Sequence, residues 1–377
     1  MKIVLAPDKF KDALSGLQFC NAVEAGIKKV RPTTKIIKLP LADGGDGTTE
    51  VIRYHLKGET ISVKVNNPFF KPVTASYVYA PHTKTAFIEM AEASGMKLLK
   101  PKQLDCVNAT TFGTGELILD AIEKGAVKII LGIGGSATND CGIGMAAALG
   151  YRFLDENNNA VKPVGANLST IKVINFDAVH PKLKTIEFQI ACDVTNPLYG
   201  NEGAAYVYAK QKGASAEDIL RLDNGLKAFS KVIEAQFNID PQNVQGAGAA
   251  GGMGIACQVF LNGALMSGIQ LVKAMVGFNL NIEDADWIIT GEGQLDAQTF
   301  SGKTIQGVLL SAKAHQIKVA ALCGAIVISD REISTLGIDY CDAIMRHAKD
   351  LDDAMQNSYN YLIEMAKVFA EQTLKIN

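Results

Sequence analysis

The stretch DADWIITGEG, residues 284–293, decides the fold that the sequence predicts. Its apolar core is typical of a buried strand that ends at Thr290, and the glycines that follow indicate a loop before a helix from about Ser301. The stretch KIVLAP near the start of the chain has the same pattern, because it leads through a polar loop into an amphipathic helix with Ser15 as N-cap. Both ends of the chain therefore predict parallel strands that alternate with helices.

The middle of the chain has a different pattern. The segments ETISVKV and VTASYVYAP flank a turn, which predicts an antiparallel hairpin, and helices and strands alternate again from Thr110. We therefore predict an α/β protein with two α/β domains. One is a doubly wound domain with a parallel sheet built from both termini, residues 1–60 and 270–377, and the other is an inserted domain with a mixed sheet, residues 61–269.

Length and composition exclude several classes of protein. At 377 residues the chain fits two domains, and its 48% hydrophobic and 20% charged content is that of an ordinary globular protein. The net charge of −2, with dispersed Lys and Arg, argues against nucleic acid or an anionic membrane as a partner. We expect small-molecule partners; a homodimer is compatible with the sequence, which does not decide the oligomeric state.

The sequence predicts a cytoplasmic protein. The apolar run at the start is too short for a secretory signal, and seven scattered cysteines without a CxxC pair suit a reducing compartment. The uncharged segment 241–272 exceeds the length of a membrane span. Its dense glycines and its central Gln258 and Asn262 favour a buried helix instead.

The candidate site residues lie in the loops after the predicted strands. Ligands of open α/β sheets bind at the carboxyl ends of strands, and these loops are rich in acids, glycines and lysines. The candidates are Asp8, Lys11 and Ser15 in the first loop, Asp43, Gly44, Gly45, Gly47 and Thr48 in the second, Gly134, Gly135, Ser136, Asn139 and Asp140 in the third, Asp193 by itself, and Glu292, Asp296 and Lys303 in the last.

Phosphoryl transfer is the chemistry that this combination favours. It requires cations and backbone donors around the transferred group, carboxylates that hold Mg²⁺, and a base near the attacking hydroxyl. Each loop taken alone has a plainer interpretation, because glycine and aspartate also form ordinary turns. The GKT that ends at Thr304 resembles the end of a P-loop, but Ala297 stands where that pattern needs glycine. The sequence also lacks a GxSxG elbow, an HExxH pair and a GxGxxG after the first strand.

A series of long motifs occurs in one order along nearly the whole chain. They are APDKFKDALS, LPLADGGDGT, TFGTGELI, GIGGSATNDCGIGMAAALG, ACDVTNPLYG, GAAGGMG and TGEGQLDAQTFSGK. In these motifs the sequence resembles the bacterial glycerate kinase family. The first motif departs from the family's usual Ser-Phe-Lys-Gly at Lys9 and Asp12. The resemblance implies a flavodoxin-like domain, a separate α/β domain and an active site in the cleft between them.

The resemblance further implies a kinase that uses ATP and Mg²⁺ to phosphorylate D-glycerate, with 2-phosphoglycerate a more usual product than 3-phosphoglycerate. On the matching positions we predict Asp43, Asp193 and Lys11 as catalytic residues, and Asp193, Glu292 and Asp296 as metal ligands. The residues predicted to bind substrate or phosphate are Asp8, Ser15, Gly44, Gly45, Gly47, Thr48, Gly134, Gly135, Ser136, Asn139, Asp140 and Lys303.

Two other functions stay open from the sequence. A kinase of another small hydroxy acid could have the same motifs, because such acids differ from glycerate by one or two polar groups. A sensor that binds a phosphorylated metabolite without turnover could use the same glycines. A sensor would release no ADP with any hydroxy acid, whereas substrate profiling separates the two kinases.

Overall fold

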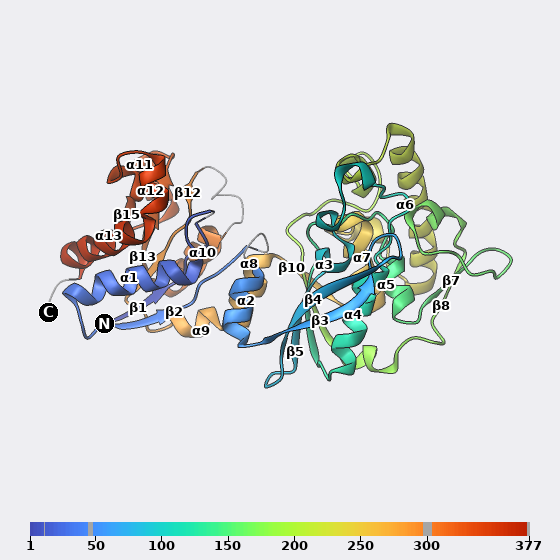
Figure 1. Cartoon of the computed structure of the whole chain (residues 1–377), viewed down its shortest axis with the longest axis horizontal. Coiled ribbons are helices and arrows are strands. Elements are labelled where there is room, and N and C mark those ends of the chain that lie inside the picture. The colour runs from blue at the N-terminus through green and yellow to red at the C-terminus, as the bar shows by residue number, and fades with distance from the viewer. Residues whose placement is uncertain (11, 44–47, 297–303, 375–377) are drawn as a thin grey trace. The chain divides into compact units, whose positions relative to one another are not determined.

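The computed structural model describes residues 1–10, 12–43, 48–296 and 304–374 (Figure 1). The chain forms two compact units: unit 1 comprises Met1–His55 and Gly268–Asn377, and unit 2 comprises Leu56–Ser267. Both units combine helices with a sheet, and the predicted α/β fold class is confirmed.

Unit 1 is built on a parallel five-stranded sheet of order β15-β13-β11-β1-β2. When only the five strands of this sheet are numbered along the chain, this is the order 2-1-3-4-5 of flavodoxin-like folds. The residues of β1 and β11 are all buried, as expected for strands of a parallel sheet with both faces covered. The strands are β1 (Lys2–Leu5), β2 (Lys35–Lys38), β11 (Trp287–Thr290), β13 (Lys318–Cys323) and β15 (Tyr340–Ala343).

Helices cover the sheet of unit 1, and two of them pack closely together. The helices α1 (Gly16–Val30) and α13 (Ser358–Thr373) lie side by side (Figure 1). A Cβ at Gly26 of α1 would lie 2.2 Å from the carbonyl oxygen of Ile363 in α13, so only glycine allows this approach. The other elements of unit 1 are α2 (Thr48–Leu56), which ends at the boundary with unit 2, α8 (Gly268–Met275), α9 (Phe278–Ile282), β12 (Gln294–Leu295), α10 (Thr304–His315), β14 (Ala325–Ile326), α11 (Asp330–Leu336) and α12 (Leu351–Gln356).

Unit 2 contains a mixed six-stranded sheet of order β10-β9-β6-β5-β4-β3. The predicted hairpin is formed by β3 and β4, whereas β5, β6, β9 and β10 run parallel to one another. The carboxyl ends of these four strands therefore meet at one edge of the sheet. The strands are β3 (Glu59–Asn66), β4 (Pro72–Ala80), β5 (Thr85–Glu89), β6 (Lys128–Gly132), β9 (Glu187–Ala191) and β10 (Ala264–Met266), with β7 (Arg152–Leu154) and β8 (Val173–Asn175) as a separate pair.

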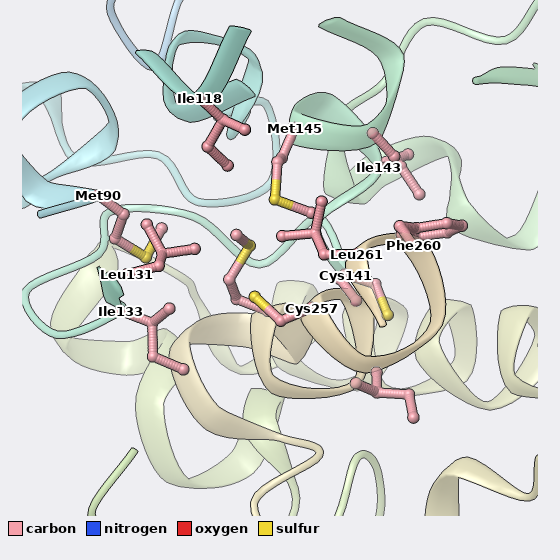
Figure 2. Packing of buried hydrophobic residues seen from close by; sticks show 14 of the residues in the cluster. Met90, Ile118, Leu131, Ile133, Cys141, Ile143, Met145, Cys257, Phe260 and Leu261 are labelled. Carbon is pink, nitrogen blue, oxygen red and sulfur yellow. The ribbon is translucent and has the colours of Figure 1, made fainter. Parts of the chain in front are cut away.

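The uncharged segment 241–272 contains a buried helix, α7 (Ala249–Leu261). Its residues Cys257, Phe260 and Leu261 belong to the same apolar cluster as Met145 and Leu131 (Figure 2). Among the described residues, no helix combines the length and the apolar character that crossing a membrane requires. The helices of unit 2 are α3 (Ala91–Ser94), α4 (Phe112–Glu123), α5 (Ile143–Ala148), α6 (Ala216–Phe237) and α7 (Ala249–Leu261).

Candidate active site

The carboxyl ends of β1 and β11 form the topological switch point of unit 1, and Asp8 lies there. The pairing of the two strands continues past their ends, because Ala6 N–H donates to Ile289 O and Asp8 N–H donates to Gly291 O, both at 2.8 Å. The buried Thr290 hydroxyl also donates to Ala6 O at 2.9 Å. Asp8 is thus held by the rigid sheet at the place where flavodoxin-like folds bind ligands.

The carboxyl group of Asp8 has a raised pKa. It accepts hydrogen bonds from Lys9 N–H at 2.7 Å and from the hydroxyl of Thr304, the first residue of α10. Burial raises the pKa of Asp8 to about 6, and the nearby charge of Asp43 adds to this increase, while the two hydrogen bonds oppose it. A carboxyl group with such a pKa can hold or release a proton under physiological conditions.

Asp43 is half-buried near Asp8, because the chain after β2 continues alongside β1. Leu41 N–H donates to Pro7 O at 2.8 Å, which fixes the segment that leads to Asp43. The candidates Gly44, Gly45 and Gly47 that follow lie outside the described residues, and Thr48 is buried as the first residue of α2. The structure therefore brings two of the predicted acids together at the switch point.

The remaining candidates of unit 1 have different surroundings. Ser15 caps α1: its hydroxyl accepts from Gln18 N–H at 3.3 Å, and the Gln18 side chain accepts from Ser15 N–H at 2.8 Å. Glu292 and Asp296 are half-buried on either side of β12, and Asp296 accepts from the amide of Gln294 at 3.1 Å. The candidates Lys11 and Lys303 lie outside the described residues.

The candidate ligands for a metal ion are carboxylates of both units. The described part of the chain contains no group of three or more His, Cys, Asp or Glu side chains that could hold one. Mg²⁺ does not require such a group, since it keeps several waters and is usually bound by one or two carboxylates together with substrate phosphates. The single carboxylates Asp193, Glu292 and Asp296 fit this kind of site.

In unit 2, three parallel strands bring polar groups to one edge of the sheet. Glu89 at the end of β5 is the register partner of Gly132 at the end of β6, and Gly132 in turn pairs with Ala191 of β9. Asp193 follows two residues later. Glu89 is not among the residues predicted from the sequence, although an acid at the end of a strand is the same signal that indicates Asp193.

The loop after β6 is open on one side and closely packed on the other. Gly134 and Gly135 are exposed, whereas the side chains of Ser136 and Asn139 are buried. Ala137 N–H donates to Ser94 O at 2.9 Å, and this bond joins the loop to the end of α3. The amide atoms of the Asn139 side chain have no hydrogen-bond partner among the residues that the structure describes.

Asp140 fastens this loop to two helices. It is fully buried, and one carboxylate oxygen accepts from both the N–H and the hydroxyl of Thr111, each at 2.8 Å. The N–H groups of Gly142 and Gly144 donate to the carboxylate at 3.2 Å. Burial raises the pKa of Asp140, and these hydrogen bonds oppose the increase. Asp140 therefore supports the shape of the loop, and its predicted role in binding substrate stays a prediction.

The glycine-rich start of α7 packs against the same loop. Cys141 N–H donates to Gly251 O at 2.9 Å, and a Cβ on Gly251 would lie 2.3 Å from the carbonyl oxygen of Thr138. Gly251 also has a φ of +75°, which glycine adopts without strain. The motif GAAGGMG thus acts as a close-fitting support, and its glycines are explained by packing.

Comparison with known proteins identifies the family. The family model described as the glycerate kinase family matches residues 3–374. The chain belongs to the glycerate kinase family. It is 40% identical to a glycerate kinase of Halalkalibacterium halodurans over 368 residues, which are 98% of this chain and 97% of that protein. It is also 40% identical to the glycerate 2-kinase of Escherichia coli K12 over 370 residues, again 98% and 97% of the two chains.

A solved structure agrees with this assignment to the glycerate kinase family. A crystal structure of a protein from Salmonella typhimurium LT2, described as a glycerate kinase 2, superposes with a TM-score of 0.88. The two chains are 39% identical, and the alignment covers 98% of this chain and 97% of that one. The predicted family is confirmed, and the protein is a phosphotransferase of a kinase family, which implies the use of ATP.

Proposed function

We propose that this member of the glycerate kinase family transfers the γ-phosphoryl group of ATP to D-glycerate and forms 2-phosphoglycerate. One observation carries the proposal: the acids Asp8 and Asp43 meet at the switch point of a chain that matches the family over residues 3–374. The name of the Escherichia coli relative, glycerate 2-kinase, supports the choice of hydroxyl.

In the proposed mechanism, Asp43 accepts the proton of the attacking hydroxyl as the oxygen bonds to the γ-phosphorus of ATP, and ADP leaves. Asp8 sits beside this base and, with Thr304, fixes its electrostatic surroundings. Lys11 is proposed to meet the carboxylate of glycerate, and Lys303 the developing charge on phosphate.

Mg²⁺ is the metal that we propose for the reaction, with Glu292 and Asp296 in unit 1 and Asp193 in unit 2 as candidate ligands. When bound to the triphosphate, Mg²⁺ would neutralise the charge that develops during transfer.

In unit 2 we propose that the exposed backbone at Gly134 and Gly135 binds an anionic group of a substrate. We also propose that the protein is cytoplasmic and forms a homodimer. Sedimentation velocity would measure its oligomeric state.

A coupled assay of ADP release tests the function. The purified protein is expected to release ADP only when ATP, Mg²⁺ and D-glycerate are all present, and ³¹P NMR of the product is expected to show phosphate on the 2-hydroxyl. Lactate, glycolate and L-glycerate serve as alternative acceptors. Faster turnover of one of these would favour a kinase of another hydroxy acid. Tight binding of a phosphorylated metabolite by a folded protein that releases no ADP with any acceptor would favour a sensor and reject the proposal.

A further inference from the structure

Lys212 is a buried lysine beneath the loop that follows β6. It ends a short 3₁₀ helix, Lys210–Lys212, and only 3% of its surface is exposed. Its Nζ donates to the hydroxyl of Ser136 at 2.7 Å and to the carbonyl oxygen of Thr138 at 2.8 Å. The ammonium group therefore holds two points of the loop from its inner side.

The charge of Lys212 has little compensation from the protein. Among the residues that the structure describes, Lys212 forms no ion pair. Asp140 is a nearby opposite charge, but its oxygens already accept hydrogen bonds from Thr111, Gly142 and Gly144. A buried charge that is not fully paired destabilises a fold. A neutral donor could make the same two hydrogen bonds with a smaller desolvation free energy. Hydrogen bonding alone therefore does not explain the positive charge at this position.

The outer side of the same loop is exposed at Gly134, where a ligand could reach the backbone. A Cβ placed on Gly134 would meet no atom of the described part of the chain within 4 Å, and Gly134 does not have the positive φ that favours glycine. Neither packing nor backbone strain therefore explains glycine at this position. By contrast, Gly251 and Gly142 on the inner side would clash with the protein as alanine. The absence of a side chain at Gly134 leaves its backbone accessible to a bound group.

We propose that Lys212 is a positioning residue that makes the turn from Gly134 to Ser136 an anion subsite. The ammonium group fixes Ser136 and Thr138 and adds a positive potential beneath the exposed backbone. The anion is either a phosphoryl group of the nucleotide or the carboxylate of the acceptor. The choice between these two anions rests on the proposed function, whereas the existence of an anion subsite does not.

Lys212→Met tests the proposal, with Lys210→Met as the matched control because Lys210 is exposed in the same short helix. Isothermal titration calorimetry would measure the Kd of ADP and the Kd of D-glycerate separately for each protein. Lys212→Met is expected to weaken at least one of them by about tenfold or more, while Lys210→Met leaves both within about twofold. Loss of ADP affinity identifies the phosphoryl group as the anion, and loss of glycerate affinity identifies the carboxylate. Unchanged affinity for both in folded Lys212→Met would overturn the proposal.

Gly134→Ala is the second variant, and it keeps the proposal testable if Lys212→Met does not fold. Alanine at residue 134 meets no protein atom, so the melting temperature is expected to stay near that of the wild type. Its methyl group would crowd the bound anion, and a severalfold weaker Kd is expected for the same ligand that Lys212→Met affects. A wild-type Kd for both ligands in Gly134→Ala would contradict the subsite.

The pH dependence of binding separates a charge from a merely structural contact. Burial lowers the pKa of Lys212 to about 8, while the nearby charge of Asp140 acts in the opposite direction. Burial raises the pKa of Cys106 to about 11, so its thiol stays neutral over this range. The affinity of the wild type for the anion is expected to fall as the pH rises through about 8, and this fall should be absent in Lys212→Met. A wild type that binds ADP and shows this pH dependence but does not phosphorylate glycerate would reject the proposed function and leave the subsite standing.

Discussion

The two units build their candidate sites in different ways. In unit 1, Asp8 and Asp43 follow the neighbouring strands β1 and β2, and the pairing of the chain beyond these strands brings the two acids near each other. In unit 2, the candidate loop after β6 is one continuous segment whose shape depends on buried polar bonds from Asp140 and Lys212. Topology thus places the carboxylates of unit 1, whereas local packing shapes the backbone of the unit 2 loop.

The largest effect is expected in unit 1, from Asp43→Asn. If Asp43 accepts the proton of the hydroxyl, kcat should fall by roughly a hundredfold or more, while the melting temperature changes little. Steady-state kinetics and a melting curve measure both, with Glu50→Gln in α2 as an exposed control. A near-normal kcat with a lower melting temperature would instead make Asp43 a structural residue of unit 1.

The corresponding change in unit 2 should act on stability. Asp140→Ala leaves the buried donors of Thr111, Gly142 and Gly144 without an acceptor, so the free energy of unfolding is expected to decrease by about 2 kcal/mol or more. Urea denaturation measures this loss, and Glu156→Ala provides an exposed control. If Asp140→Ala keeps wild-type stability but loses substrate affinity, the loop support that we assign to Asp140 is wrong.

Asp8 gives unit 1 a pH-dependent stability. In the unfolded chain Asp8 loses its proton near its ordinary pKa of 3.8, but in the folded protein it keeps the proton up to about pH 6. Between these values the folded state binds more protons, so the contribution of Asp8 to the free energy of unfolding falls as pH rises through this window. Asp8→Asn should therefore gain about 2 kcal/mol of unfolding free energy relative to the wild type when the pH is changed from about 4 to about 7, because the pKa of Asp8 differs by about two units between the unfolded and the folded state. A constant difference between the two proteins over this range would contradict the raised pKa.

The smallest effect concerns Asp12, where the chain departs from the family's usual glycine. Asp12 has a φ of +61°, a conformation that glycine adopts freely and that other residues adopt with some strain. Asp12→Gly is expected to raise the free energy of unfolding by about 0.5 kcal/mol, and Asp12→Ala to lower it by about 1 kcal/mol. Thermal unfolding measures both variants: the melting temperature should rise in Asp12→Gly and fall in Asp12→Ala. Equal changes in the two variants would mean that the backbone at Asp12 carries no strain.

The sequence predicts the framework of each site better than the contacts within it. The apolar runs KIVL and WIIT predict buried parallel strands, and from their ends the acids Asp8 and Glu292 can be selected. That Asp8 and Asp43 lie near each other is shown only by the pairing of β1 with β2 in the structure. The hydrogen bond between Asp8 and Thr304 does not follow from the sequence either, because it joins residues 296 positions apart.

In unit 2 the sequence indicates the loop but not its supports. Lys212 stands in the polar run KQKG, which is typical of an exposed turn, and only the fold buries it against Ser136. Asp140 has the same pattern as an acid that contacts ligand, yet its partner Thr111 comes from a motif 29 residues earlier. Pairs of this kind depend on how the helices pack, which the periodicity of one sequence does not specify.

The pairing of β1 with β11 also constrains how the chain folds as it is synthesised. Ala6 and Thr290, which are hydrogen-bonded at the ends of these strands, lie 284 residues apart, whereas the strands of unit 2 are contained in one continuous segment. On a ribosome, unit 2 can fold while the first strand of unit 1 still has one unpaired edge, because its neighbour has not yet been made. The late arrival of residues 287–290 makes closure of the unit 1 sheet a high-contact-order step. Newly made chains should therefore be most prone to aggregation through β1, and a truncation before residue 287 should prolong the exposure of that edge.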